Sequence, residues 1–222
     1  MAAVSCTGGI LAGGAASRFG GAPKGLERVS GRRIIDRVAS ALREVSDDLL
    51  LIANAEDAAT WLPGVRTAAD VRPGLGALGG LHAALAHADS DVLLVAWDMP
   101  FVSAALLGEL RRIGDGGADE SHHALSFVTK ADVVIPESDG SRRGVEPMCA
   151  WYSRRCLPAV ERTLDAGDLR VIGFHDHVTV QRLPIVRVRD FGDPARLFSN
   201  VNTREELAAL GGVGSAAGSP RG

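Results

Sequence analysis

Short apolar runs alternate with segments of helical periodicity in the first half of this 222-residue chain, and this alternation restricts the fold more than any other feature. Residues 4–11, 49–53 and 92–96 have the length and composition of buried strands, and a weaker strand is predicted at 65–69. Between the runs, apolar residues recur at helical spacing, as at Ile34, Ile35, Val38, Leu42 and Val45. The pattern predicts an α/β protein with a parallel sheet and helices on both faces.

The second half of the chain is less regular. A strand pair is predicted at 132–135 and 147–152 around a Ser138-Asp139-Gly140 turn, followed by a helix at 157–164 and a strand at 183–188. Ser103 is a candidate cap for the helix that follows it, and a capping box at 203–206 predicts a last helix. Residues 114–123 are predicted to form a mobile loop. We therefore expect a single domain over residues 1–210 and a flexible tail over 211–222.

Composition limits which partners the protein can bind and in which cellular compartment it is expected. The net charge of −3 and the pI near 6.1 argue against a nucleic-acid-binding or membrane-surface protein. No apolar run approaches the ~20 residues that span a bilayer, and the N-terminus lacks a secretory pattern. The odd cysteine count without a C-x-x-C pair suits free, buried thiols in a reducing compartment. A cytoplasmic protein is the expectation.

Residues 11–24 form a glycine-rich loop directly after the first predicted strand. Four glycines allow the backbone to approach an anion closely, and Arg18 and Lys24 add positive charge that suits a polyphosphate. Lys24 is one of only two lysines, beside 22 arginines. The spacing fits neither G-x-G-x-x-G nor G-x-x-x-x-G-K-[ST], which disfavours standard dinucleotide binding and P-loop chemistry.

Polar residues follow the other predicted strands as well. Asn54 follows the second strand, Asp70 ends the weak third one and Asp98 follows the run 92–96. Ligands of open parallel sheets bind beyond the carboxyl ends of the strands, so these side chains should converge with the glycine loop. A carboxylate at the position of Asp98 suits Mg²⁺, which takes one or two carboxylates together with substrate phosphates.

Other chemistries find less support. His122-His123 and His175-x-His177, the latter placed on a predicted strand, lack a third ligand at zinc-site spacing. Ser17 has no partner set typical of a serine hydrolase. The three cysteines are interpreted as core residues.

With these motifs assembled, the chain resembles the molybdenum cofactor guanylyltransferase family, within the nucleotidyltransferases of Rossmann-like fold. The resemblance spans most of residues 8–210. It rests on Leu11-Ala12-Gly13-Gly14 with Arg18, Gly20 and Lys24, on Asn54, on Asp70, on Gly76-Ala77-Leu78-Gly79-Gly80-Leu81, on Asp98-Met99-Pro100-Phe101, and on Asn200-Val201-Asn202-Thr203-Arg204-Glu205-Glu206-Leu207. It implies a Rossmann-like, three-layer α/β/α fold with a mostly parallel sheet.

The resemblance also implies a reaction in which Mg²⁺-bound GTP donates GMP to the terminal phosphate of a molybdopterin cofactor and releases pyrophosphate. It implies transient contact with proteins that make or accept the cofactor. The implied roles are nucleotide contact by the backbone of Leu11, Ala12, Gly13 and Gly14, phosphate contact by Arg18 and Lys24, metal binding by Asp98, nucleotide contact by Asn54 and Asp70, and a position towards the pterin for Asn200 and Asn202.

The chain departs from the family pattern in three places. Pro23 precedes the lysine where the family often has an acidic residue, Ser17 lies one position later than usual, and residues 114–130 form an extra loop. Two alternatives stay open: a related nucleotidyltransferase that uses CTP or a sugar-phosphate acceptor, and a non-catalytic nucleotide-binding or cofactor-delivery protein. Leu-Ala-Gly-Gly resembles the guanylyl type, and the presence of both Lys24 and Asp98 favours catalysis.

Overall fold

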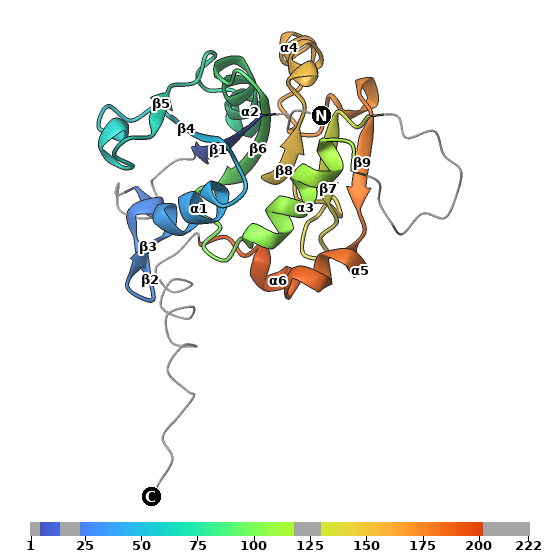
Figure 1. Ribbon diagram of the computed structural model, residues 1–222. Helices are drawn as coiled ribbons and strands as arrows, with labels where there is room; N and C mark the ends of the chain where they lie inside the picture. The colour runs from blue at the N-terminus through green and yellow to red at the C-terminus, as the bar shows by residue number, and fades with distance from the viewer. Residues whose placement is uncertain (1–4, 14–22, 118–129, 202–222) are drawn as a thin grey trace, which may run out of the picture.

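The computed structural model describes residues 5–13, 23–117 and 130–201, and its centre is a seven-stranded sheet (Figure 1). The strand order is β5-β4-β1-β6-β8-β7-β9, and all of these strands except β8 run in one direction. Their bounds are β1 Cys6–Ala12, β4 Asp48–Ala53, β5 Arg66–Ala68, β6 Asp91–Ala96, β7 Val133–Pro136, β8 Cys149–Tyr152 and β9 Val180–Leu183. A separate two-residue ladder joins β2 Arg28–Val29 to β3 Arg32–Arg33.

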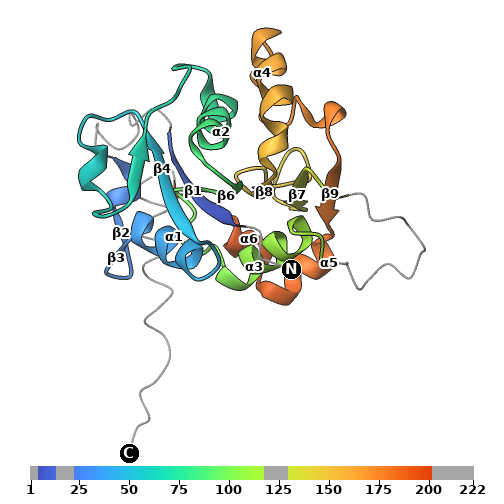
Figure 2. The ribbon, with the colours of Figure 1, turned by 45° about the horizontal axis from the view of Figure 1, so that its top comes forward.

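Helices cover both faces of the sheet, so the architecture has three layers (Figure 2). Helices α1 Ile34–Arg43 and α3 Ala104–Gly114 pack on one face with the short α5 Ile185–Val188 and α6 Pro194–Leu197. Helices α2 Gly76–His87 and α4 Leu157–Asp165 pack on the other. The 3-10 turns are η2 Lys24–Leu26, η3 Ala58–Thr60, η4 Arg154–Cys156, η5 His175–His177 and η6 Arg189–Phe191. The expected α/β/α fold with a mostly parallel sheet is confirmed.

The order of connections places a crevice at the carboxyl end of β1. From β1 the chain passes through α1 to β4 on one side, and from β5 it returns through α2 to β6 on the other side of β1. In the paired register, Leu11 lies opposite both Ile52 and Ala96, so the three strands end at the same edge. Such a reversal of strand order is where open α/β sheets bind ligands.

Most of the predicted elements are present, within two residues at each end. Ser103 caps α3 by accepting the Leu106 N–H at 3.5 Å. The strand pair 132–135 and 147–152 corresponds to the antiparallel β7 and β8. The three cysteines are buried and free, and burial raises the pKa of the Cys6 and Cys156 thiols to about 12. No described helix has the length and hydropathy needed to span a bilayer.

Two predictions about the second half are wrong. The strand predicted at 183–188 is instead the end of β9 followed by α5, because Pro184 cannot donate to a ladder and the Glu137 carboxylate accepts the Ile185 N–H at 3.0 Å. His175 and His177 lie on the 3-10 turn η5 rather than on a strand. The helix predicted from 203, the tail 211–222, His122-His123 and most of the loop 114–130 lie outside the described residues.

Candidate functional site

A cavity of about 650 Å³ opens at the carboxyl ends of β1, β4 and β6. Its wall contains the ends of these strands, the loop before α2 and the beginning of α2. The lining residues are Leu11, Ala12, Gly13, Ile52, Asn54, Asp70, Gly74, Gly76, Ala77, Gly80, Ala96, Trp97, Asp98, Met148 and Asn200. Gly13 at the start of the glycine loop, Asn54, Asp70 and Asp98 therefore meet in one place, as predicted; residues 14–22 of the loop lie outside the described residues.

Asp98 and Lys24 form an ion pair at this cavity. The Lys24 ammonium, on η2, donates to Asp98 Oδ2, which lies two residues beyond β6. The two side chains are 19% and 12% exposed, so water screens the pair only partly. A carboxylate and an ammonium from residues 74 positions apart in the sequence thus meet at the sheet edge.

Asn54 and Asp70 hold each other in place. The Asn54 side-chain amide donates to Asp70 Oδ2 at 2.7 Å, and the Asp70 backbone N–H donates to Asn54 Oδ1 at 2.8 Å. This reciprocal pair joins the end of β4 to the loop after β5. Both side chains line the cavity in a fixed orientation, with oxygen atoms and an amide available to a polar ligand.

The start of α2 brings backbone N–H groups to the wall of the cavity, beside the polar side chains. Gly74 and Gly76 have φ values of +83° and +63°, which only glycine adopts without strain, and they carry the chain into the helix. Free N–H groups at the first turn of a helix attract negative charge. Four residues later, a Cβ on Gly80 would lie 2.3 Å from Leu11 Cδ1, so glycine is needed for the close packing of α2 on Leu11.

Asn200 reaches the cavity because the chain near residue 200 is tied to Asp98. The Val201 N–H donates to the Asp98 carbonyl oxygen at 3.0 Å, and Val201 is fully buried against Val29 and Ile34. Asn200 therefore lines the same cavity as Asp98. Of the residues predicted for the site, Gly14, Arg18 and Asn202 lie outside the described residues.

Glu146 is a neighbour of Asp98 that the sequence analysis missed. Strands β6 and β8 pair Val95 with Cys149, and the ladder continues with an Ala96 N–H to Met148 carbonyl bond of 2.8 Å. A turn closed by the Cys149 N–H to Glu146 carbonyl bond of 3.2 Å separates Glu146 from β8, and its carboxyl lies close enough to Asp98 for the two charges to interact. Burial, together with the negative charge of Asp98, raises the pKa of the Glu146 carboxyl to about 7. One acidic residue between Val145 and Pro147 was the available signal, but its position depends on the turn that precedes β8.

Glu146 should make folding stability depend on pH. Its folded pKa of about 7 lies above the ordinary value of 4.5, so the folded state holds a proton that the unfolded state releases between these values. The free energy of unfolding should therefore fall as pH rises from 4.5 to 7, by about 3 kcal/mol from this group at 1.36 kcal/mol per pKa unit.

Urea denaturation of metal-free protein at pH 5 and pH 8 measures this effect. Glu146→Gln should lose that part of the pH dependence, and it should be more stable than the wild type at pH 8. Glu44→Gln, at an exposed glutamate after α1, is the matched control and should follow the wild type. Parallel profiles for the wild type and Glu146→Gln would contradict the assignment.

Comparison with known proteins identifies the fold and the family. The family model of the MobA-like NTP transferase domain matches residues 8–179. The molybdenum cofactor guanylyltransferase of Desulfosudis oleivorans is 36% identical over 203 residues, which cover 90% of this chain and 92% of that protein. The corresponding enzyme of Vibrio campbellii is 29% identical and covers 91% of this chain and 93% of its own length.

A solved structure shows the same fold. The crystal structure of molybdopterin-guanine dinucleotide biosynthesis protein A from Archaeoglobus fulgidus superimposes with a TM-score of 0.74 at 24% identity, over 95% of this chain and all of that one. The matched segment includes the strands that end at the cavity. On these grounds the chain belongs to the family of MobA-like nucleotidyltransferases, as the sequence motifs predicted.

Proposed function

We propose that this protein transfers GMP from GTP to the terminal phosphate of a molybdopterin cofactor that carries molybdenum, and releases pyrophosphate. The main support is the 36% identity, over 90% of the chain, to a protein named molybdenum cofactor guanylyltransferase. The cavity at the ends of β1, β4 and β6 supports it independently, because a carboxylate, an ammonium and a helix N-terminus meet there.

The proposed reaction is a single displacement at phosphorus. An oxygen of the acceptor phosphate attacks the α-phosphorus of GTP, the bond from this phosphorus to the α–β bridging oxygen breaks, and pyrophosphate leaves with the electron pair. The attacking phosphate is already ionised at neutral pH, so no strong general base is required. The protein then contributes positioning and neutralisation of charge.

Each part of the cavity has a proposed role in that reaction. The backbone of Leu11, Ala12 and Gly13 would contact the nucleotide, as would the Asn54–Asp70 pair, which keeps its polar groups in one orientation. Lys24 would supply positive charge to the phosphates, joined by Gly14 and Arg18. Asn200 and Asn202 would lie towards the pterin.

The residues at the cavity also fit Mg²⁺. Asp98 lines the cavity and provides a carboxylate oxygen, and the Glu146 carboxyl lies close enough to interact with its charge. Mg²⁺ binds through one or two carboxylates together with substrate phosphates, so this donor set suits it. Asp98 would hold the ion, which when bound neutralises charge on phosphate oxygens.

Pyrophosphate release by the full chain tests the proposal. With Mg²⁺ and molybdenum-loaded molybdopterin, GTP should support turnover at least about tenfold faster than CTP, which corresponds to about 1.4 kcal/mol of discrimination. Equal rates with both nucleotides would reject guanine selectivity. Turnover with a sugar phosphate instead of molybdopterin would reject the acceptor. Binding of GTP without turnover would favour a delivery protein.

A thermal-shift measurement gives the binding side of the same test. A ligand at 100 times its Kd stabilises the folded state by about 2.7 kcal/mol, and Mg²⁺ with GTP should produce such a shift where CTP gives less.

A further inference from the structure

Trp97 lies between the end of β6 and Asp98, and its neighbours include Leu11, Trp61 and Gly25. Its backbone N–H donates to the Leu11 carbonyl oxygen at 3.1 Å, which continues the pairing of β6 with β1. Its ring stacks on Trp61, with centroids 5.3 Å apart and planes 20° from parallel. Only 5% of the residue is exposed, and the exposed part lines the cavity. The backbone pairing with β1 and the stacking on Trp61 thus hold the indole in place.

The third of these neighbours is Gly25, on the turn that carries Lys24. A Cβ on Gly25 would lie 2.3, 2.6 and 2.9 Å from Trp97 Cε3, Cδ2 and Cζ3, all atoms of the six-membered ring. The stacked ring cannot move aside as the end of a flexible side chain does, so only glycine permits this packing. The turn is fixed in other ways too: the Glu27 N–H donates to the Lys24 carbonyl at 3.1 Å, and the Ile34 N–H donates to the Glu27 carbonyl at 2.9 Å.

The contact lies directly beside the Lys24–Asp98 ion pair. Lys24 immediately precedes Gly25, and Asp98 immediately follows Trp97. The packing of the indole on the Gly25 backbone therefore fixes the distance between the two backbone segments that carry Lys24 and Asp98. Trp97 Nε1 is buried and has no hydrogen-bond partner in the part of the chain that the structure describes. The contact therefore depends on the packing of the ring and not on a hydrogen bond from its nitrogen.

We propose that Trp97 is a positioning residue: by packing against Gly25 it sets Lys24 at the distance from Asp98 that the transfer of the nucleotidyl group requires. This inference rests on the proposed function, because it assumes that Lys24 addresses the phosphates of the nucleotide. Trp97 carries no charge, and in this proposal it acts through Lys24. Displacements of about 1 Å near reacting groups can cost on the order of 10²-fold in rate, so a methyl group inserted at this contact should be detectable.

Two variants disturb the contact from opposite sides. Gly25→Ala adds a methyl group that overlaps with the indole ring, and Trp97→Leu removes the ring. Each should lower kcat by about tenfold or more. Each should also weaken the binding of GTP more than that of guanosine, which has no phosphates. Lys24→Met serves as the reference for that loss of selectivity, and calorimetric titration measures it without turnover.

The double variant separates positioning from general damage. If Gly25→Ala acts through overlap with the indole, it should cost nothing further once Trp97 is leucine, so the two effects on kcat should be strongly non-additive. Trp151→Leu is the matched control, because Trp151 is fully buried on β8 and a Cβ on Gly114 would meet its ring at 2.3 Å in the same way. It should destabilise the fold about as much as Trp97→Leu and change kcat less than about threefold, with its ratio of GTP to guanosine affinity unchanged.

The outcomes distinguish this inference from the proposed function. A wild type that neither binds GTP nor releases pyrophosphate would contradict the proposed function. If the wild type is active but the effects of the two substitutions add, the positioning role of Trp97 is overturned. Equal kcat losses in Trp151→Leu and Trp97→Leu would overturn it too. An unchanged GTP to guanosine ratio in Gly25→Ala would overturn it as well.

Discussion

Replacing Asp98 by asparagine should lower turnover by on the order of 10²-fold or more, which corresponds to at least about 2.7 kcal/mol of transition-state stabilisation. The substitution keeps the size of the side chain but removes the charge that is proposed to hold Mg²⁺ and that pairs with Lys24. Steady-state pyrophosphate release measures the loss, and the circular dichroism spectrum verifies that the variant is folded.

The matched control is at the other end of the same strand. Asp89 lies just before β6 and its side chain is 95% exposed, so Asp89→Asn should leave turnover unchanged. Turnover within a few-fold of the wild type in Asp98→Asn would refute the role given to this carboxylate, whatever the behaviour of the control.

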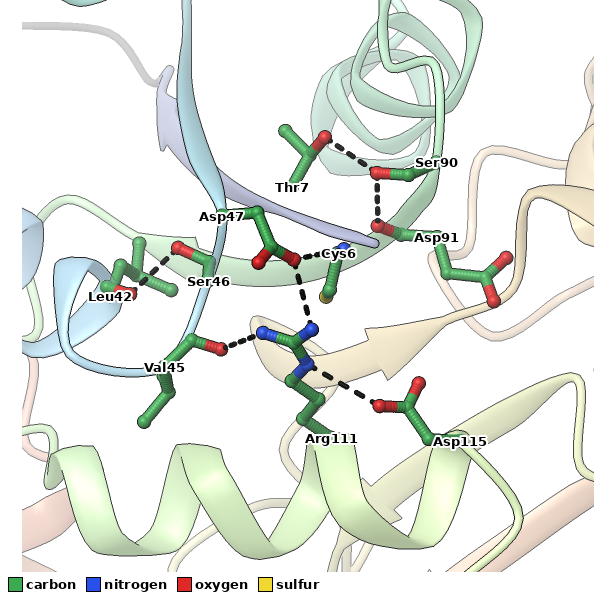
Figure 3. A network of polar contacts seen from close by, with 10 residues as sticks. All are labelled: Cys6, Thr7, Leu42, Val45, Ser46, Asp47, Ser90, Asp91, Arg111 and Asp115. Atoms are coloured by element: carbon green, nitrogen blue, oxygen red, sulfur yellow. Dashed lines mark hydrogen bonds and ion pairs between the residues drawn. The ribbon is translucent and has the colours of Figure 1, made fainter. Parts of the chain in front are cut away.

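Arg111→Met should destabilise the fold by about 2–4 kcal/mol, because Arg111 joins α3 to the amino-terminal ends of β1 and β4 (Figure 3). Its guanidinium donates to the Val45 carbonyl at 2.7 Å, to Asp47 at 2.9 Å and to Asp115 at 3.4 Å. The same Asp47 oxygen accepts the Cys6 N–H at 2.8 Å, and these donors lower the pKa of Asp47. Methionine would leave two carboxylates without this partner.

Urea denaturation gives the free energy of unfolding for this comparison. Arg189→Met is the control: its side chain is 58% exposed and pairs at 3.2 Å with Asp139, which is 70% exposed, and such surface pairs contribute less than about 1 kcal/mol. The Arg111 network lies at the edge opposite to the cavity. Arg111→Met should therefore retain the wild-type kcat at temperatures where it is folded. A similar loss of stability in both variants would show that the network adds nothing beyond a surface ion pair.

The strands that end at the cavity were predictable because they are buried on both faces. Residues 49–53 and 92–96 are uninterrupted apolar runs, and Asn54 and Asp98 follow them closely enough that the sheet edge alone brings the two together. Their convergence needed only the rule that parallel strands end at one edge. The same rule placed Asp70 there, although β5 is only three residues long.

The features that could not be predicted depend on contacts between distant segments. Whether residues 185–188 continue a strand depends on Glu137, whose carboxylate accepts the Ile185 N–H from 48 positions away. The place of Glu146 depends on the turn before β8 and on the bond of its N–H to the Pro136 carbonyl, and the packing of Trp97 on Gly25 depends on how η2 meets the end of β6. Local periodicity carries none of this information.

The antiparallel direction of β8 has a consequence for which loops of this architecture can change in length. A strand that runs with the others presents the loop after it at the cavity, whereas β8 presents the loop before it. Residues 138–144 are closed at their base by the Ser138 N–H to Gly144 carbonyl and Glu146 N–H to Pro136 carbonyl bonds, both 3.0 Å long. Insertions and deletions within that loop can accumulate during divergence while Glu146 keeps its place. The half of the sheet that ends in β1, β4 and β6 has no comparable freedom, because its lining residues follow directly from the ends of the strands.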